Sequence, residues 1–172
     1  SASNSSVIVA PTLVYGAAGE HQSFTGTLSI GTDALIAVLV ELVRSASTHF
    51  DRIVLLSGHG GNADALDLAV TQLRREGHTV DAVLPRLPGA DAHAGRAETS
   101  LLLHLTPDLV RLDRAEAGAL EPLGELLPQL RAGGTASVSP NGVLGDPSGA
   151  SAREGERLLR ALVNHARRSA RL

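Results

Sequence analysis

The chain of 172 residues has no cysteine, methionine, tryptophan or lysine, and its only aromatic side chains are Tyr15, Phe24 and Phe50. The absence of cysteine excludes disulfide bonds and thiolate metal sites. The scarcity of aromatic rings argues against platforms on which nucleic-acid bases stack. The net charge is −3 and the arginines are spread along the sequence, so no basic stripe for phosphate backbones is evident. We therefore expect no nucleic-acid partner.

Long apolar runs are also missing. The longest candidate, residues 35–43, is interrupted by Glu41, and nothing resembles a signal peptide. We expect a cytoplasmic protein without a membrane partner. The length predicts a single domain over residues 1–172. Its first part, residues 1–6, is small and polar and is expected to be a disordered lead-in or a cloning remnant.

Three short apolar runs, residues 7–10, 53–56 and 79–84, have the length and branching of buried strands. Amphipathic helices are expected between them, over 33–47 and from Asn62, a candidate N-cap, onward. Right-handed crossovers then give a parallel sheet whose strands all end at the same edge. The pattern predicts an α/β fold.

The second half of the chain has a weaker pattern. A helix is expected from about Ala94 to Leu105, and a last helix is expected after a capping box formed by Ser151 and Glu154. Between them, over residues 109–134, Pro122 and Pro128 are expected to prevent a helix.

One histidine stands at a predicted strand end. His59 follows the strand 53–56 and precedes a helix, which places it in the crevice where open α/β sheets bind ligands. Glycines at 58, 60 and 61 would let the backbone approach a ligand or a metal closely. The alternative is an ordinary turn that happens to contain histidine.

Two further segments are expected to reach the same edge. The long glycine-rich loop 15–27 carries Glu20 and His21, which are either ligands or acid–base groups, or, for Glu20, only an anchor of the loop. His93 in a loop and Glu98 in the first turns of the next helix converge by helical geometry. The alternative for Glu98 is an ordinary surface residue at the start of a helix. The segment 137–146 is expected over the mouth of the site or at a subunit contact.

Four stretches together resemble the creatininase family of metal-dependent amidohydrolases. They follow the family's order and are Gly19-Glu20-His21, Ser57-Gly58-His59-Gly60-Gly61-Asn62, His93-Ala94-Gly95 with Glu98-Thr99-Ser100, and Gly142-Val143-Leu144-Gly145-Asp146-Pro147. The resemblance implies three α/β/α layers around a mainly parallel sheet. It also implies a centre of two divalent metal ions (zinc, iron or manganese) and a homo-oligomer.

The resemblance further implies the roles of individual residues. His59 would be a metal ligand, and Glu98 would replace a glutamate that creatininase carries where this chain has Gly61. His93 would be the acid–base or substrate-orienting group. The residues expected to bind substrate are Glu20, His21, Gly60, Gly61 and Asn62.

The implied activity is hydrolysis of an amide or peptide bond. The motifs favour the branch of the family that releases a modified C-terminal dipeptide from a ribosomally made precursor peptide. The alternatives are a small cyclic-amide or formamide hydrolase, and a non-catalytic binding or structural subunit. The family's first motif, Glu-x-His-Gly-x-His-Leu-Pro-x-x-Thr-Asp, does not occur in this chain. We therefore expect the first strand and three ligands to be missing, and the chain alone to bind metal poorly and to be inactive.

Overall fold

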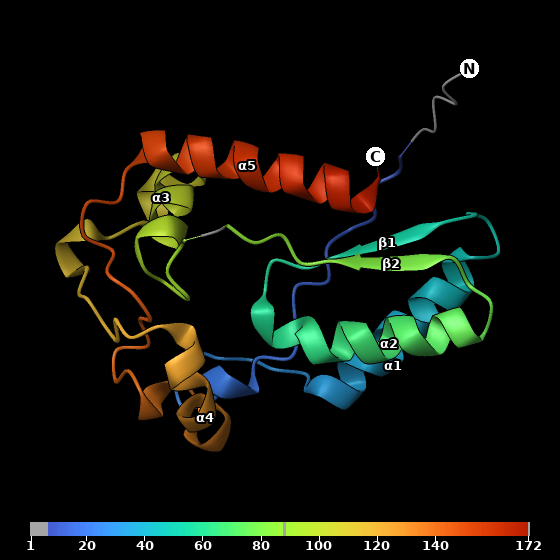
Figure 1. Ribbon diagram of the computed structural model, residues 1–172, viewed down its shortest axis with the longest axis horizontal. Helices are drawn as coiled ribbons and strands as arrows, with labels where there is room; N and C mark the ends of the chain where they lie inside the picture. Colours follow the sequence, from blue (N-terminus) through green and yellow to red (C-terminus); the bar gives the residue numbers. More distant parts are fainter. Residues whose placement is uncertain (1–6, 88, 172) are drawn as a thin grey trace.

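The computed structural model describes residues 7–87 and 89–171, so the predicted lead-in at 1–6 lies outside it. The longer elements follow one another from the N-terminus to the C-terminus (Figure 1). In chain order they are α1 (Thr32–Ala46), β1 (Ile53–Leu56), α2 (Ala63–Arg75), β2 (Val80–Val83), α3 (Arg96–Leu105), α4 (Leu123–Gly133) and α5 (Ala152–Ala170).

The strands β1 and β2 form a parallel pair in which Ile53 lies opposite Val80 and Leu56 lies opposite Val83. Helix α2 connects them as a βαβ unit. In Figure 1, α1 and α2 lie on one side of the two strands and α5 runs along the other. This arrangement confirms the predicted α/β fold, with helices on both sides of a small parallel sheet.

The apolar core lies between the sheet and the helices α1 and α2. Apart from Ala17, which lies in a loop, its members belong to the inward faces of helices and strands; together they are Ala17, Leu35, Leu39, Val40, Val43, Ala65, Leu66, Ala69, Val70, Leu73 and Val80. The side chain of Leu73 is fully buried. Because this core surrounds the βαβ unit, it fixes the strand end from which His59 emerges.

The prediction of a strand at residues 7–10 is wrong. This segment lies outside the sheet, which in the described residues consists of β1 and β2. Ile8 and Val9 are 72% and 88% exposed. An apolar run becomes a strand only where a neighbouring backbone pairs with it, and here none does so.

The prediction that residues 109–134 hold no helix is also wrong, because α4 spans Leu123–Gly133 with Pro128 inside it. Pro122 precedes the first turn, where its fixed φ and missing N–H cost little. Pro128 removes one internal hydrogen bond. Leu126 is buried and the N–H of Gly134 donates to the carbonyl of Leu130 at 2.8 Å, so packing and a closed C-terminal turn outweigh that loss.

Helix α5 begins at the predicted place, with the hydroxyl of Ser151 accepting from the N–H of Glu154 at 3.3 Å. The N–H of Ser151 donates to the hydroxyl of Ser100 at 3.1 Å rather than to Glu154, so only half of the predicted capping box forms. It packs on α3 at a point where small residues meet, since a Cβ on Gly155 would collide with the carbonyl oxygen of Ser100. Among the helices of the described ranges, none is both long and apolar enough to span a bilayer. The packing of α5 on α3 positions the start of α3, which carries Glu98.

Candidate active site

His59 leaves the end of β1 in a turn that is closed by polar side chains. The N–H of His59 donates to the hydroxyl of Ser57 at 3.2 Å, and the amide nitrogen of Asn62 donates to the same hydroxyl at 3.1 Å. His59 itself is extended, with φ −109° and ψ 123°. The turn therefore presents the imidazole at the carboxyl edge of the sheet, as predicted.

The sequence suggested Asn62 as the N-cap of α2, but its side chain makes no capping hydrogen bond. The side-chain amide oxygen of Asn62 instead accepts from the N–H of Ala17 at 2.9 Å. The next N–H, that of Ala18, donates to the hydroxyl of Ser29 at 2.9 Å. These two bonds hold the loop that carries Glu20 against the His59 turn. Sequence reasoning gave no role to Ser29 or Ser57, although Ser57 stands in the same stretch as His59 and Ser29 closely follows the loop 15–27.

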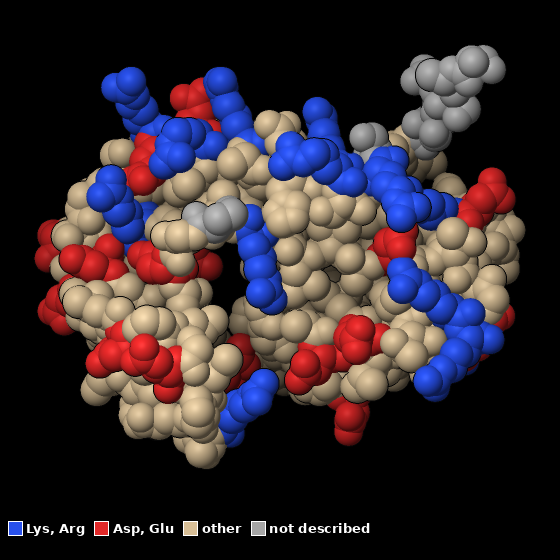
Figure 2. Space-filling model, viewed as in Figure 1, with Lys and Arg blue, Asp and Glu red and all other residues tan. Residues whose placement is uncertain are grey.

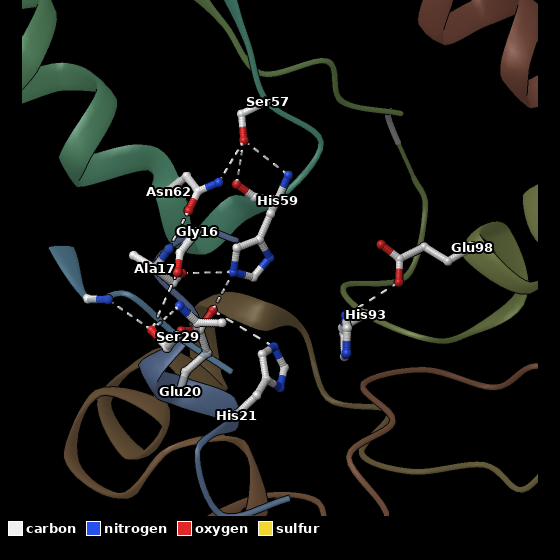
Figure 3. Close-up of polar contacts among 12 residues, drawn as sticks. Gly16, Ala17, Glu20, His21, Ser29, Ser57, His59, Asn62, His93 and Glu98 are labelled. Carbon is white, nitrogen blue, oxygen red and sulfur yellow. Dashed lines mark hydrogen bonds and ion pairs between the residues drawn. The ribbon is translucent and has the colours of Figure 1, made fainter. Parts of the chain in front are cut away.

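Glu20 and His21 lie beside His59 (Figure 3). The Nε2 atom of His59 is 3.1 Å from Oε1 of Glu20 and 3.1 Å from the carbonyl oxygen of Ala17. The ring of His21 stands between two other imidazoles, with centroids 6.0 Å from His59 and 4.6 Å from His93. Three histidines from three separate segments thus gather in one place.

His93 and Glu98 converge as the helical geometry predicted, with Nδ1 of His93 3.3 Å from Oε2 of Glu98. The same carboxylate oxygen accepts from the N–H of Ala94 at 2.6 Å. The backbone of His93 pairs with that of Leu144, whose N–H donates to the His93 carbonyl at 2.8 Å. The segment 137–146 therefore lies directly against the site.

The start of α3 is held by Asp91, to which the sequence analysis assigned no role. One carboxylate oxygen of Asp91 accepts from the N–H of Ala97 at 3.0 Å, and the other accepts from the N–H of Arg96. These bonds satisfy two of the N–H groups that lack partners at a helix start. Asp91 therefore fixes the turn from which Glu98 projects.

The pKa values of the histidines differ because their neighbours differ. Burial lowers the pKa of His21, and the nearby His93 lowers it further. The hydrogen bond to Glu98 raises the pKa of His93. The same bond lowers the pKa of Glu98. One imidazole is thus biased toward the neutral form and its neighbour toward the cation, a separation suited to acid–base chemistry.

The donors at this edge suit a divalent metal in type but do not complete a metal site. Imidazole nitrogen and carboxylate oxygen are appropriate ligands for zinc, iron or manganese. Among residues 7–87 and 89–171, however, no three histidine, aspartate or glutamate side chains are grouped as a metal ion requires. In Figure 3, Glu20, His21 and His59 lie on one side, and His93 and Glu98 lie on the other. The described residues therefore supply only part of a ligand set.

A cavity of about 750 Å³ lies elsewhere, along α5 and Arg96. Figure 2 shows arginine side chains along this edge of the molecule. Glu154 pairs with Arg96 at 2.7 Å and with Arg157 at 3.3 Å, and Glu156 pairs with Arg160 at 2.5 Å. The fold therefore gathers arginines that are distant in sequence, but it neutralises several of them with glutamates, and the histidine cluster remains the candidate active site.

A family model described as creatinine amidohydrolase matches residues 1–169. The chain belongs to the creatininase family. It is 54% identical over 157 residues to the mycofactocin precursor peptide peptidases of Mycobacterium ulcerans and of Mycolicibacterium smegmatis. The match covers 91% of this chain and 63% or 64% of those relatives, so the chain spans less than two thirds of their length.

More distant members of the creatininase family include enzymes of known structure. The creatinine amidohydrolase of Pseudomonas putida is 31% identical over 137 residues, which are 62% of this chain and 53% of that enzyme. A structure described as a manganese creatininase superposes with a TM-score of 0.72 at 28% identity, covering 93% of this chain and 75% of the other. A zinc–zinc form of a mutant creatininase gives 0.66 at 26% identity, covering 91% and 72%. The predicted family and fold are confirmed.

Proposed function

We propose that this chain forms part of a metal-dependent peptidase that releases a modified C-terminal dipeptide from a ribosomally made precursor peptide in mycofactocin biosynthesis. The observation that carries the proposal is the convergence of three histidines and two glutamates, from segments far apart in sequence, at one edge of the sheet. The 54% identity to peptidases of that name supports the choice of substrate.

Each residue has a role in this proposal. His59 and Glu98 would contribute ligands to divalent metal ions, two per complete site and of zinc, iron or manganese. A bound metal lowers the pKa of water and polarises an amide carbonyl. His93, whose pKa Glu98 raises, holds a proton that it can donate to the leaving nitrogen. We further propose that the peptide is contacted by residues of the loop and the turn beside His59, namely Glu20, His21, Gly60, Gly61 and Asn62.

The chain alone is expected to release no dipeptide, so the test joins the family's first motif to its N-terminus, supplies the processed precursor peptide with zinc or manganese, and measures the released dipeptide by mass spectrometry. We expect release to fall at least about 100-fold in His93→Ala, because general acid catalysis contributes that much. His104→Ala, which removes a histidine outside the cluster, is the matched control. Equal loss in both variants, or no loss in His93→Ala, contradicts the assignment.

A second candidate is hydrolysis of a small cyclic amide, favoured by the similarity to the creatinine amidohydrolase of Pseudomonas putida. Creatinine and a formamide serve as competing substrates in the same assay. Faster turnover of either one than of the precursor peptide would replace the peptidase proposal.

We also propose that the protein is cytoplasmic and acts as a homo-oligomer. Support for the oligomer comes from the apolar side chains of Ile8, Val9 and Val14, which are 72%, 88% and 80% exposed. Apolar residues gathered on a surface commonly mark a protein–protein contact. Light scattering tests this: a concentration-independent monomer would contradict it.

A further inference from the structure

Position 61 has no room for a side chain. A Cβ built on Gly61 would collide with Oε1 of Glu20 and with Nε2 of His59, and it would lie 2.8 Å from the carbonyl oxygen of Ala17. The neighbouring Gly60 differs, because nothing lies within 4 Å of a Cβ there. Neither glycine is among those with a positive φ. Gly61 is therefore needed for space, and the carboxylate of Glu20 occupies that space.

The backbone of Glu20 is fixed from two directions. It belongs to a 3₁₀ turn, Gly19–His21, whose preceding N–H, that of Ala18, is bound by Ser29. On another side Gly134 approaches so closely that a Cβ there would lie 2.9 Å from the Glu20 carbonyl oxygen. With the backbone held in this way, the carboxylate projects toward His59 (Figure 3).

The contacts of His59 indicate which ring nitrogen carries the proton. Nε2 faces two acceptors, the carbonyl oxygen of Ala17 and Oε1 of Glu20, each at 3.1 Å. A ring nitrogen between two acceptors must donate, and in a neutral imidazole the other nitrogen then keeps its lone pair. Nδ1 of His59 is therefore the atom left to accept.

We propose that Glu20 is a positioning residue: its carboxylate, 3.1 Å from Nε2, acts together with the Ala17 carbonyl to which Nε2 is hydrogen-bonded, and both acceptors hold the His59 ring so that Nδ1 is the atom presented to a metal ion. A carboxylate that binds the second nitrogen of a histidine fixes the ring orientation and makes the ligand nitrogen more basic. The orientation of the ring stands on the contacts above, and only its use at a metal rests on the proposed function. The competing role for Glu20 is that of a loop anchor, which would leave His59 unaffected.

The first experiment records the imidazole nitrogen and proton resonances of His59 in the metal-free protein labelled with ¹⁵N-histidine. We expect a hydrogen-bonded Nε2 proton that exchanges slowly with water. Glu20→Ala should make this proton exchange faster with water, because only the Ala17 carbonyl remains as an acceptor, and Glu20→Gln, which keeps an acceptor oxygen of the same reach, should restore slow exchange in part. An unchanged His59 signal in Glu20→Ala overturns the proposal.

The second experiment adds zinc alone and follows the same resonances. We expect the zinc-dependent change at Nδ1 of His59. Glu20→Ala and Gly61→Ala should weaken zinc binding about 10- to 100-fold, the usual effect of removing a partner of a metal ligand. Gly124→Ala on α4 is the control and should stay within about twofold, because the same methyl group meets nothing within 4 Å there.

The outcomes separate the two levels of the argument. A zinc-dependent change at Nε2, or equal zinc affinity in Gly61→Ala and Gly124→Ala, overturns the role of Glu20 and leaves the metal-dependent function standing. Failure of every variant and of the wild type to bind zinc removes support from the proposed metal site, whereas the metal-free spectra still decide the role of Glu20. Thermal unfolding identifies a misfolded Gly61→Ala protein, and Glu20→Ala, which adds no atoms, then carries the test.

Discussion

In the half of the chain that ends with β2, the side chain buried at the centre is Leu73, which is 0% exposed and belongs to a cluster of apolar residues. In the half that begins with α3, the corresponding position is held by Ser100, which is also 0% exposed. The hydroxyl of Ser100 accepts from the N–H of Ser151 at 3.1 Å and contacts the carboxylate of Glu154 at 3.4 Å. One half is centred on apolar packing and the other on small residues and hydrogen bonds.

The candidate site lies where the two halves meet. His59 follows the last strand residue of β1 in the apolar half, Glu98 projects from the polar half, and His93 lies in the loop that leads into that half. Apolar burial is strong but indifferent to direction, whereas hydrogen bonds are weaker and directional. Changes in the first half should therefore act mainly on stability, and changes in the second should act mainly on the geometry of the His93–Glu98 pair.

The largest expected effect comes from Leu73→Ala. Truncation leaves a cavity between α2 and the sheet, and it should lower the free energy of unfolding by about 2–5 kcal/mol. Leu68→Ala on the same helix is the control, since Leu68 is 53% exposed, and it should cost less than about 1 kcal/mol. Urea denaturation followed by circular dichroism measures both. Similar midpoints for the two variants would mean that the apolar half is not centred on Leu73.

Gly155→Ala tests the close approach of α5 to α3. The new Cβ meets the carbonyl oxygen of Ser100, so overpacking should cost about 1–3 kcal/mol despite the better helix propensity of alanine. In Gly124→Ala on α4 nothing lies within 4 Å of the new Cβ, and there the same substitution should stabilise by up to about 1 kcal/mol. Opposite signs in thermal melts are the expected result. A stabilising Gly155→Ala would show that the two helices can separate without loss.

The difference between the halves also explains what the sequence could predict. His59 was placed correctly because apolar strand patterning indicates where β1 ends, although the side chains of this strand are only partly buried and Leu56 is 63% exposed. His93 and Glu98 were brought together correctly because a loop followed by a helix start constrains them locally. These are features that neighbouring residues determine.

Features that depend on distant partners were not predictable. Residues 7–10 have the composition of a strand, but pairing requires a second backbone that no local pattern identifies. Helix α4 forms through Pro128 because Leu126 is buried by other segments. Asn62 stands in the N-cap position of α2, yet its side chain binds Ala17, which lies 45 residues away. In each case a tertiary contact decided between local alternatives.

Asp91→Ala tests the hydrogen bonds of the polar half at the site itself. It removes the acceptor for the N–H groups of Arg96 and Ala97, and loss of such a cap should cost about 0.5–2 kcal/mol. Asp113→Ala removes an exposed carboxylate whose nearest cation, on Arg111, is 3.9 Å away, and it should change stability by less than about 0.5 kcal/mol. Amide hydrogen exchange in α3 provides the second measurement. Equal protection of α3 in both variants would contradict the role given to Asp91.

Glu98→Gln has the smallest expected effect on stability and the most specific effect on the site. Glu98 raises the pKa of His93 by a hydrogen bond, so the variant should lower that pKa, measured by NMR titration of the imidazole. A raised histidine pKa stabilises the folded state below the ordinary histidine pKa, and this contribution is lost as the pH rises through the raised value. The lowered pKa of Glu98 adds stability above the ordinary glutamate pKa, and this is lost as the pH falls through the lowered value.

The stabilisation by this pair should therefore be complete between the two ordinary pKa values and should decline on both sides. Because the Glu98 side chain is half exposed, the contribution should stay below about 1 kcal/mol. Glu98→Gln should flatten this dependence on pH, whereas Glu121→Gln, which removes the same charge from an exposed position, should not. An unchanged pKa of His93 would mean that the carboxylate of Glu98 does not set the protonation of the imidazole. The polar half would then hold the site through its main chain, by the backbone pairing of His93 with Leu144.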